Sequence, residues 1–172
     1  MSANGLDAFD KTIQTTNIWL NEIMEQIGPD RQVAWKALST VLHKLRDRLP
    51  IGLAAHLGAE LPLLVRGVYY DQFEPAKLPS DCDTPEQFVA EVAKWLGDTR
   101  TVDPDLATRA VFGVLSRYVA PGQLDKVCQA LPKQLRQWFE GMRDEQMRAP
   151  TNSVDKPALF GNAADRPETT EI

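Results

Sequence analysis

The chain has 172 residues, a net charge of −5 at pH 7 and a hydrophobic share of 43%, which suits one globular domain or two small ones. The acidic balance argues against nucleic acid as a partner, because binding to a phosphate backbone draws its affinity from Lys and Arg. The longest apolar runs, such as residues 61–65, are far shorter than the ~20 residues that a membrane span requires.

The beginning of the chain lacks the cationic and apolar regions of a secretory signal. Residues 1–8 are expected to form a flexible N-terminus. Cys82 and Cys128 are far apart in sequence, so two free thiols are expected. Together these features predict a cytoplasmic protein.

Two parts of the chain resemble each other at an offset of about 70 residues. Capping residues, glycines and Leu-Pro pairs recur in the same order, which favours an internal duplication over a chance likeness of amphipathic helices. The predicted halves are residues 9–73 and 84–142, and residues 74–83 form the linker. The matched pairs are Thr15 with Thr84, Trp19 with Phe88, Glu22 with Glu91, Gly28 with Gly97, Asp30 with Asp103, Leu61-Pro62 with Leu131-Pro132 and Arg66 with Arg136.

Each half reads as helical, with apolar residues three and four positions apart. The first helices are expected to stop at Gly28 and Gly97, and the second to start at Asp30 and Asp103. Thr84 is a good N-cap, because Pro85 and Gln87 follow it as in a capping box.

A third helix is expected after Pro50 or Pro121, and a fourth at each Leu-Pro pair. No alternating run of β-branched residues competes with these helices. The sequence therefore predicts an all-α fold, a duplicated multi-helix bundle whose two halves share one core.

The periodicity is lost beyond residue 142, where Pro150, Pro157 and Pro167 interrupt a polar segment. Such a segment buries too little apolar surface to offset its ordering entropy. Residues 143–172 are predicted to be a disordered tail, with Leu159 and Phe160 as its one adhesive spot.

Side chains suited to catalysis are scarce. His43 and His56 are expected to face water, and neither stands in a metal-ligand spacing. We expect Glu22 and Glu91 to be solvated or to pair helices, and not to form a catalytic carboxylate pair. Cys128 is expected to be buried like a small hydrophobic residue. Phosphate-binding loops and nucleophile elbows are absent from the sequence. We expect no enzyme activity, no metal site and no cofactor.

The fourth helix of the first half differs from its twin on one face. Its buried side is predicted to carry Leu61, Leu64, Val65, Val68 and Gln72, with Tyr69 at the edge. The opposite side carries Leu63, Arg66 and Tyr70, with Phe73 close by, whereas the twin has Lys133, Arg136 and Glu140 there.

Leu63, Arg66, Tyr70 and Phe73 therefore form the candidate interaction surface, because aromatic residues, leucine and arginine in this mixture resemble interface centres. Three interpretations stay open. The face packs against the other half, it binds a second copy or a protein partner, or it is a set of scattered exposed hydrophobes.

The segment "VLHKLRDRLPIGLAAHLGAELPLLVRGVYYDQF" strongly resembles the bacterial domain of unknown function 2267 family. The resemblance is carried by the succession of Arg48-Leu49-Pro50, Leu61-Pro62, Arg66-Gly67 and Tyr69-Tyr70, and it extends from about Phe9 to Met142. It is looser in the second half, where Gln137, Phe139 and Glu140 replace Gly-Tyr-Tyr. The resemblance implies a compact bacterial helical domain and brings no activity with it.

The leading hypothesis is a non-catalytic module for protein interaction or self-association. The alternative is a small-molecule binder with an apolar cleft between the two halves, since pockets favour such junctions.

Overall fold

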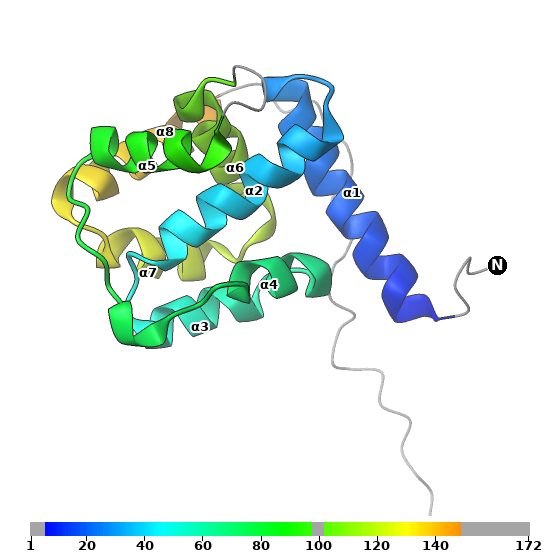
Figure 1. Ribbon diagram of the computed structural model, residues 1–172, viewed down its shortest axis with the longest axis horizontal. Coiled ribbons are helices and arrows are strands. Elements are labelled where there is room, and N and C mark those ends of the chain that lie inside the picture. The colour runs from blue at the N-terminus through cyan, green and yellow to red at the C-terminus, as the bar shows by residue number, and fades with distance from the viewer. Residues whose placement is uncertain (1–5, 98–101, 149–172) are drawn as a thin grey trace, which may run out of the picture.

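The computed structural model describes residues 6–97 and 102–148, and the regular elements in these residues are all helical (Figure 1). The predicted all-α fold is thus confirmed. The elements are α1 (Asp7–Ile27), α2 (Arg31–Arg46), α3 (Ile51–Ala59), α4 (Leu63–Tyr70), the 3₁₀-helix η1 (Pro75–Lys77), α5 (Pro85–Leu96), α6 (Pro104–Tyr118), α7 (Pro121–Ala130) and α8 (Lys133–Arg148).

Local capping chemistry sets several helix ends where the sequence predicted them. The Asp30 carboxylate accepts the backbone N–H groups of Gln32 and Val33, and Asp103 accepts that of Asp105. Thr84 forms the expected capping box at the start of α5. The first helices stop at Gly28 and Gly97, whose φ angles of +113° and +61° suit glycine.

Both predicted terminal boundaries need correction. Helix α1 begins at Asp7, inside the segment expected to be flexible, and α8 runs on to Arg148, six residues into the predicted tail. Ion pairs hold these last polar turns, since Arg143 pairs with Asp125 and Glu145 lies 3.0 Å from Arg109. Apolar periodicity alone does not register such contacts. Leu159 and Phe160 lie outside the described residues.

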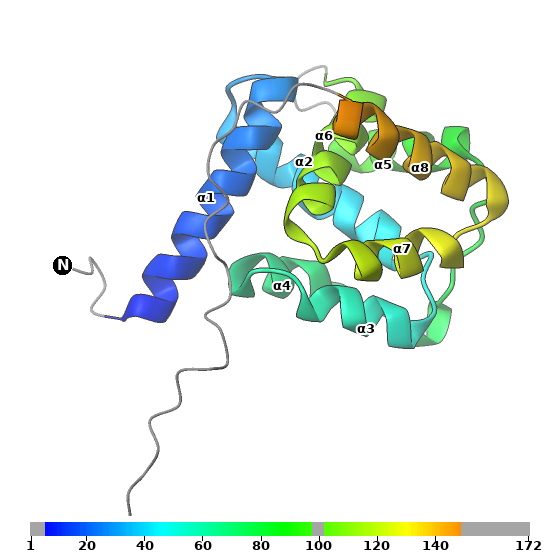
Figure 2. The same ribbon diagram turned by 180° about the vertical axis from the view of Figure 1, so that it is seen from behind.

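The middle of the molecule is the pair α2 and α6, which pack on each other (Figures 1 and 2). Helices α1 and α5 each pack on both members of this pair. Helix α4 packs on α2 as α8 packs on α6, and α3 meets α7. One hydrophobic cluster takes residues from all eight α-helices. The contacts of the first four helices thus match those of the last four, while the duplication itself stays a prediction.

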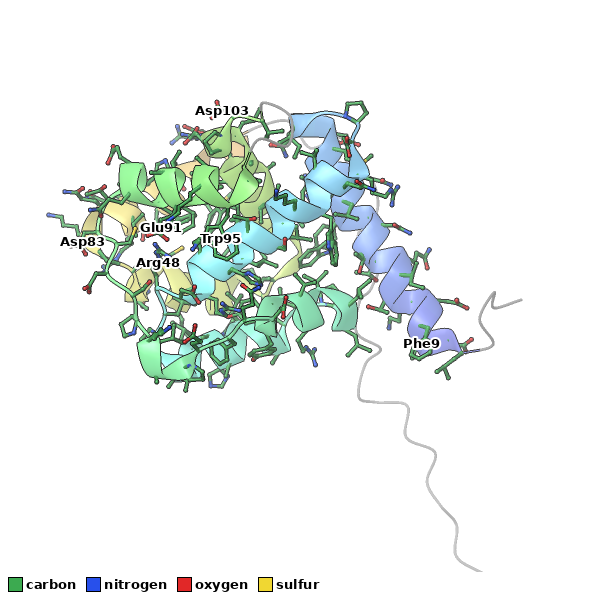
Figure 3. The ribbon with its side chains drawn as sticks, in the orientation of Figure 1. Phe9, Arg48, Asp83, Glu91, Trp95 and Asp103 are labelled. Atoms are coloured by element: carbon green, nitrogen blue, oxygen red, sulfur yellow. The ribbon has the colours of Figure 1, made fainter. Side chains whose placement is uncertain are left out.

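Two glutamates that recur in the sequence form polar contacts between these helices. One links α1 to α6, and the other links α5 to the end of α2. Glu22 on α1 lies 3.1 Å from the Arg117 guanidinium on α6 and accepts a hydrogen bond from the Tyr118 hydroxyl. Glu91 on α5 lies 2.6 Å from Arg48, at the end of α2 (Figure 3). The helix-pairing interpretation of both glutamates is confirmed.

These contacts shift the pKa values of the groups involved. Burial, followed by the hydrogen bond to Glu22, raises the pKa of Tyr118 to about 12, so its hydroxyl stays protonated and keeps donating. Burial alone raises the pKa of Glu91, but the hydrogen bonds and charges of Arg48 and Lys44 outweigh it. The pKa of Glu91 therefore lies below its usual value of 4.5.

We expect Glu91→Gln to lower the free energy of unfolding at neutral pH and to have little effect in acid. A carboxyl whose pKa is depressed by folding contributes stability above its unfolded pKa, and this is lost as the pH falls through the folded value. The loss should stay below ~1 kcal/mol, because the Glu91 side chain is 38% exposed.

Urea unfolding at neutral pH and well below pH 4.5 measures this difference. Glu140→Gln, an exposed position in the middle of α8, is the control and should change little at either pH. An equal loss for Glu91→Gln at both pH values would contradict the ion-pair account.

Candidate functional site

The four residues of the predicted interaction surface differ in how far they are exposed. Leu63 is the first residue of α4 and is more than half exposed. Arg66, on the same helix, is half-buried. Tyr70 and Phe73 are also half-buried, and their rings meet edge to face at 5.5 Å. Of these four residues, Leu63 is the one that is largely exposed, and the other three are partly covered.

Arg66 holds the end of α3 in place. Its Nε donates to the Gly58 carbonyl at 3.0 Å, and its Nη2 donates to those of Ala59 and Leu61 at 2.9 and 3.1 Å. Arg136 does the same in the second half, where its Nη2 donates to Gln129 and Leu131. The recurrence of this arginine thus has a structural cause, because unpaired carbonyls at a helix end need donors.

Tyr70 and Phe73 pack inside the first four helices. The Tyr70 hydroxyl donates to the Ala55 carbonyl on α3 at 3.3 Å, and its ring lies against Gly58. The Phe73 ring lies 5.2 Å from the Arg46 guanidinium. These two residues thus make contacts within the first four helices.

The predicted buried side of α4 was wrong at three positions. Leu64 and Gln72 are exposed, whereas Tyr69, expected at the edge, is fully buried and donates to the Ala54 carbonyl at 2.7 Å. Burial also raises the pKa of Tyr69. The buried positions are Leu61, Val65 and Tyr69, four residues apart. Helix α4 itself begins at Leu63, after Pro62. Leu131, Leu135 and Phe139 repeat this spacing in the twin.

A groove of about 250 Å³ lies between the first half of α1, the start of α4 and the end of α6. Helix α1 has eight residues, 7–14, before Thr15, whereas α5 starts directly after the equivalent Thr84. This extension forms one wall of the groove, and Thr12 accepts the Leu64 backbone N–H at 3.0 Å. The lining residues are Ala8, Lys11, Thr12, Thr15, Trp19, Glu60, Leu61, Pro62, Leu63, Arg66 and Tyr118.

Apolar side chains are also exposed around the same two segments. We call these five residues, each between 43% and 57% exposed, the α1–α4 surface: Leu6, Phe9, Ile13, Leu63 and Leu64. At about 100° per residue, Leu6, Phe9 and Ile13 share one side of α1, away from the side that lines the groove. Phe9 stands at the end of α1 that projects beyond the other helices (Figures 2 and 3).

Sequence reasoning missed the α1 part of this surface because Leu6 was assigned to a flexible terminus, and because Phe9 and Ile13, inside the predicted first half, were not assigned to a helix face. The signal was present, since Leu6, Phe9 and Ile13 are three and four positions apart.

A second hollow, of about 210 Å³, lies beside α2 and is lined by His43, Lys44, Arg46 and Trp95 among others. Its cations already have partners in the fold. Arg46 is buried and donates to the backbone carbonyls of Tyr69 and Asp71, and Lys44 lies 3.4 Å from Glu91.

The remaining candidate groups are placed as follows. His43 does not simply face water as expected, because it is half-buried with its Nε2 2.6 Å from the Val68 carbonyl oxygen. His56 is exposed, as predicted. Cys82 and Cys128 are both free and buried, and burial raises the pKa of Cys128 to about 11. Over residues 6–97 and 102–148, no three His, Cys, Asp or Glu side chains gather as metal ligands would.

The fold and its surfaces define a small domain that is all-helical over residues 6–97 and 102–148. A family model described as "Uncharacterized conserved protein (DUF2267)" matches residues 16–138. The chain therefore belongs to the DUF2267 family. The search of curated proteins found no match. None of the helices described has the length and apolar character to span a bilayer.

We expect Gly58→Ala to destabilise the protein relative to Gly52→Ala by at least ~1 kcal/mol. A Cβ on Gly58 would lie 2.4 Å from the Tyr70 hydroxyl oxygen, so the ring must leave α3, whereas nothing lies within 4 Å of a Cβ on Gly52. Alanine at Gly52 should gain ~0.5–1 kcal/mol from helix propensity. Urea unfolding of both variants measures the difference. Equal stabilisation would mean that Tyr70 does not pack on Gly58.

Proposed function

We propose that this chain is a non-catalytic interaction module of the bacterial cytoplasm, which binds protein through the α1–α4 surface. One observation carries the proposal. Nine large hydrophobic side chains are exposed among the described residues, and five of them belong to this surface. The five stand on two segments that are in contact with each other, and exposed apolar side chains concentrated in this way are typical of interaction sites.

The energetics of covering the surface agree with such a role. Each half-exposed large side chain would contribute about 1 kcal/mol on burial, half of what full burial is worth. Five of them supply roughly 5 kcal/mol before the costs of association. This suits a surface at the centre of a larger contact, in which polar neighbours form the rim.

A duplication followed by divergence accounts for the difference between the halves. The burial pattern of residues 61–69 recurs position by position at 131–139. Lys133 and Gln134 occupy the positions of Leu63 and Leu64, at the start of a helix that has no α1-like extension beside it. On this proposal the first half retained Leu63 and Leu64 because they form, together with the α1 extension, a surface that contacts a partner protein.

The two halves we propose are residues 9–73 and 84–142. The cytoplasmic location is supported by two free, buried cysteines, which suit a reducing compartment.

A specific observation favours a second candidate function, that of a small-molecule binder. The groove is lined by residues of α1 and α4 and also by Tyr118 of α6. It therefore lies where the first four helices meet the later ones, at the kind of junction where ligand pockets occur.

The interaction is tested by placing a photoreactive phenylalanine analogue at position 9 of the full chain and irradiating the cells that produce it. We expect covalent adducts with protein at position 9, because Phe9 is half exposed at the projecting end of α1. The matched control is the same analogue at Ile51, which is also half exposed but lies on α3.

Adducts are detected by blotting and identified by mass spectrometry. A second copy of the chain or a foreign protein attached at position 9 would each support the interaction. Absence of adducts, or equal labelling at position 51, would contradict it.

A further inference from the structure

The groove holds two positive charges that have no carboxylate partner among the described residues. Its lining includes Lys11 and Arg66, and neither forms an ion pair within the part of the chain that the structure describes. The protein as a whole is acidic, with a net charge of −5. Unpaired cations beside an apolar wall are therefore a local feature that favours an anion.

Arg66 is fixed in an orientation that leaves part of its guanidinium available. Its Nε and Nη2 are occupied by the carbonyls of Gly58, Ala59 and Leu61, so the plane of the group is held. The two N–H groups of its Nη1 have no acceptor among the described residues. A guanidinium held in this way loses little conformational entropy when it binds an anion.

The remaining lining fits a hydrocarbon chain of limited length. Trp19, Leu61, Pro62 and Leu63 supply apolar surface next to the two cations. A volume of about 250 Å³ holds about eight non-hydrogen atoms, at the ~30 Å³ that one water molecule occupies in the liquid. Because the groove is partly open, a ligand slightly larger than this also fits.

The backbone of the groove disfavours a peptide as the occupant. The Leu64 N–H is already bonded to Thr12, and Arg66 already takes the carbonyls at the end of α3. The Thr15 hydroxyl donates to the Lys11 carbonyl. The N–H and C=O groups of a peptide would lose water here without gaining partners, which is costly, whereas a hydrocarbon chain needs none.

We infer that this groove binds a medium-chain aliphatic carboxylate, with its carboxylate against Lys11 and the Arg66 Nη1 and its chain on Trp19, Leu61 and Leu63. The inference rests on the second candidate function, that of a small-molecule binder. Glu60 is the one carboxylate among the described lining residues, so the fixed charges of the groove sum to a net positive charge.

Calorimetric titration of the full chain with octanoate tests the inference. We expect saturable binding of one octanoate per chain. Octanol, which has the same chain without the charge, should bind at least fivefold more weakly, and octyltrimethylammonium should not bind. Octanol binding as tightly as octanoate, or no octanoate binding at all, would overturn the inference.

Four variants locate the site. Lys11→Gln should weaken octanoate binding about threefold to fivefold, the size of a partly exposed ion pair, and Glu60→Gln should strengthen it about threefold. Leu63→Asp should abolish binding, whereas Ile51→Asp, an equally exposed position on α3, should leave it unchanged.

Retention of the wild-type circular dichroism spectrum and melting temperature shows that each variant is folded. If the affinity for octanoate is unchanged in both Lys11→Gln and Leu63→Asp, the ligand binds elsewhere and the assignment is refuted. Because Phe9 does not line the groove, failure of this titration leaves the crosslinking test of protein interaction unaffected.

Discussion

The packing of α1 and α5 across the central α2–α6 pair is the contact on which the rest of the fold depends. Each of these two helices reaches a partner from the other group of four, and each does so through a glutamate. Glu22 binds Arg117 and Tyr118 on α6, and Glu91 binds Arg48 and Lys44 at α2. The polar contacts flank apolar ones, since Trp19 stacks on Tyr118 at 5.6 Å and Phe88 lies against the Arg48 guanidinium. One core shared by all eight α-helices is the consequence.

This packing explains why two similar helices present different surfaces. Helices α4 and α8 bury the same positions and carry the same carbonyl-binding arginine, so their difference is not one of internal structure. The difference arises beside them. Helix α1 is held at its C-terminal half by α2 and α6, and its first eight residues extend past the body next to Leu63 and Leu64. Helix α5 has no such extension, and polar residues take the corresponding positions at the start of α8.

The two proposed activities use different sides of the same extension. Leu6, Phe9 and Ile13 offer a flat apolar stripe, which suits a protein, whereas the opposite flank forms a hollow next to unpaired cations, which suits a small anion. Leu63 is the one residue that the α1–α4 surface and the described lining of the groove have in common. The second hollow differs, because Arg46 and Lys44 there are already neutralised or hydrogen-bonded within the fold.

The sequence by itself determined the helical class and most helix ends, while for Glu22 and Glu91 it left solvation and helix pairing both open. The class and the helix ends follow from local chemistry, because a capping carboxylate such as Asp30 or a glycine such as Gly28 acts within one turn of its own chain. Only the tertiary structure decided which side of α4 is buried, that Tyr70 and Phe73 pack internally, and that Arg66 binds carbonyls of α3. Those outcomes depend on where neighbouring helices lie. A periodic sequence pattern predicts the width of an apolar helix face better than it predicts the direction in which that face points. The α1 extension is the clearest case, since its apolar spacing was present in the sequence but its exposure resulted from the position of α4.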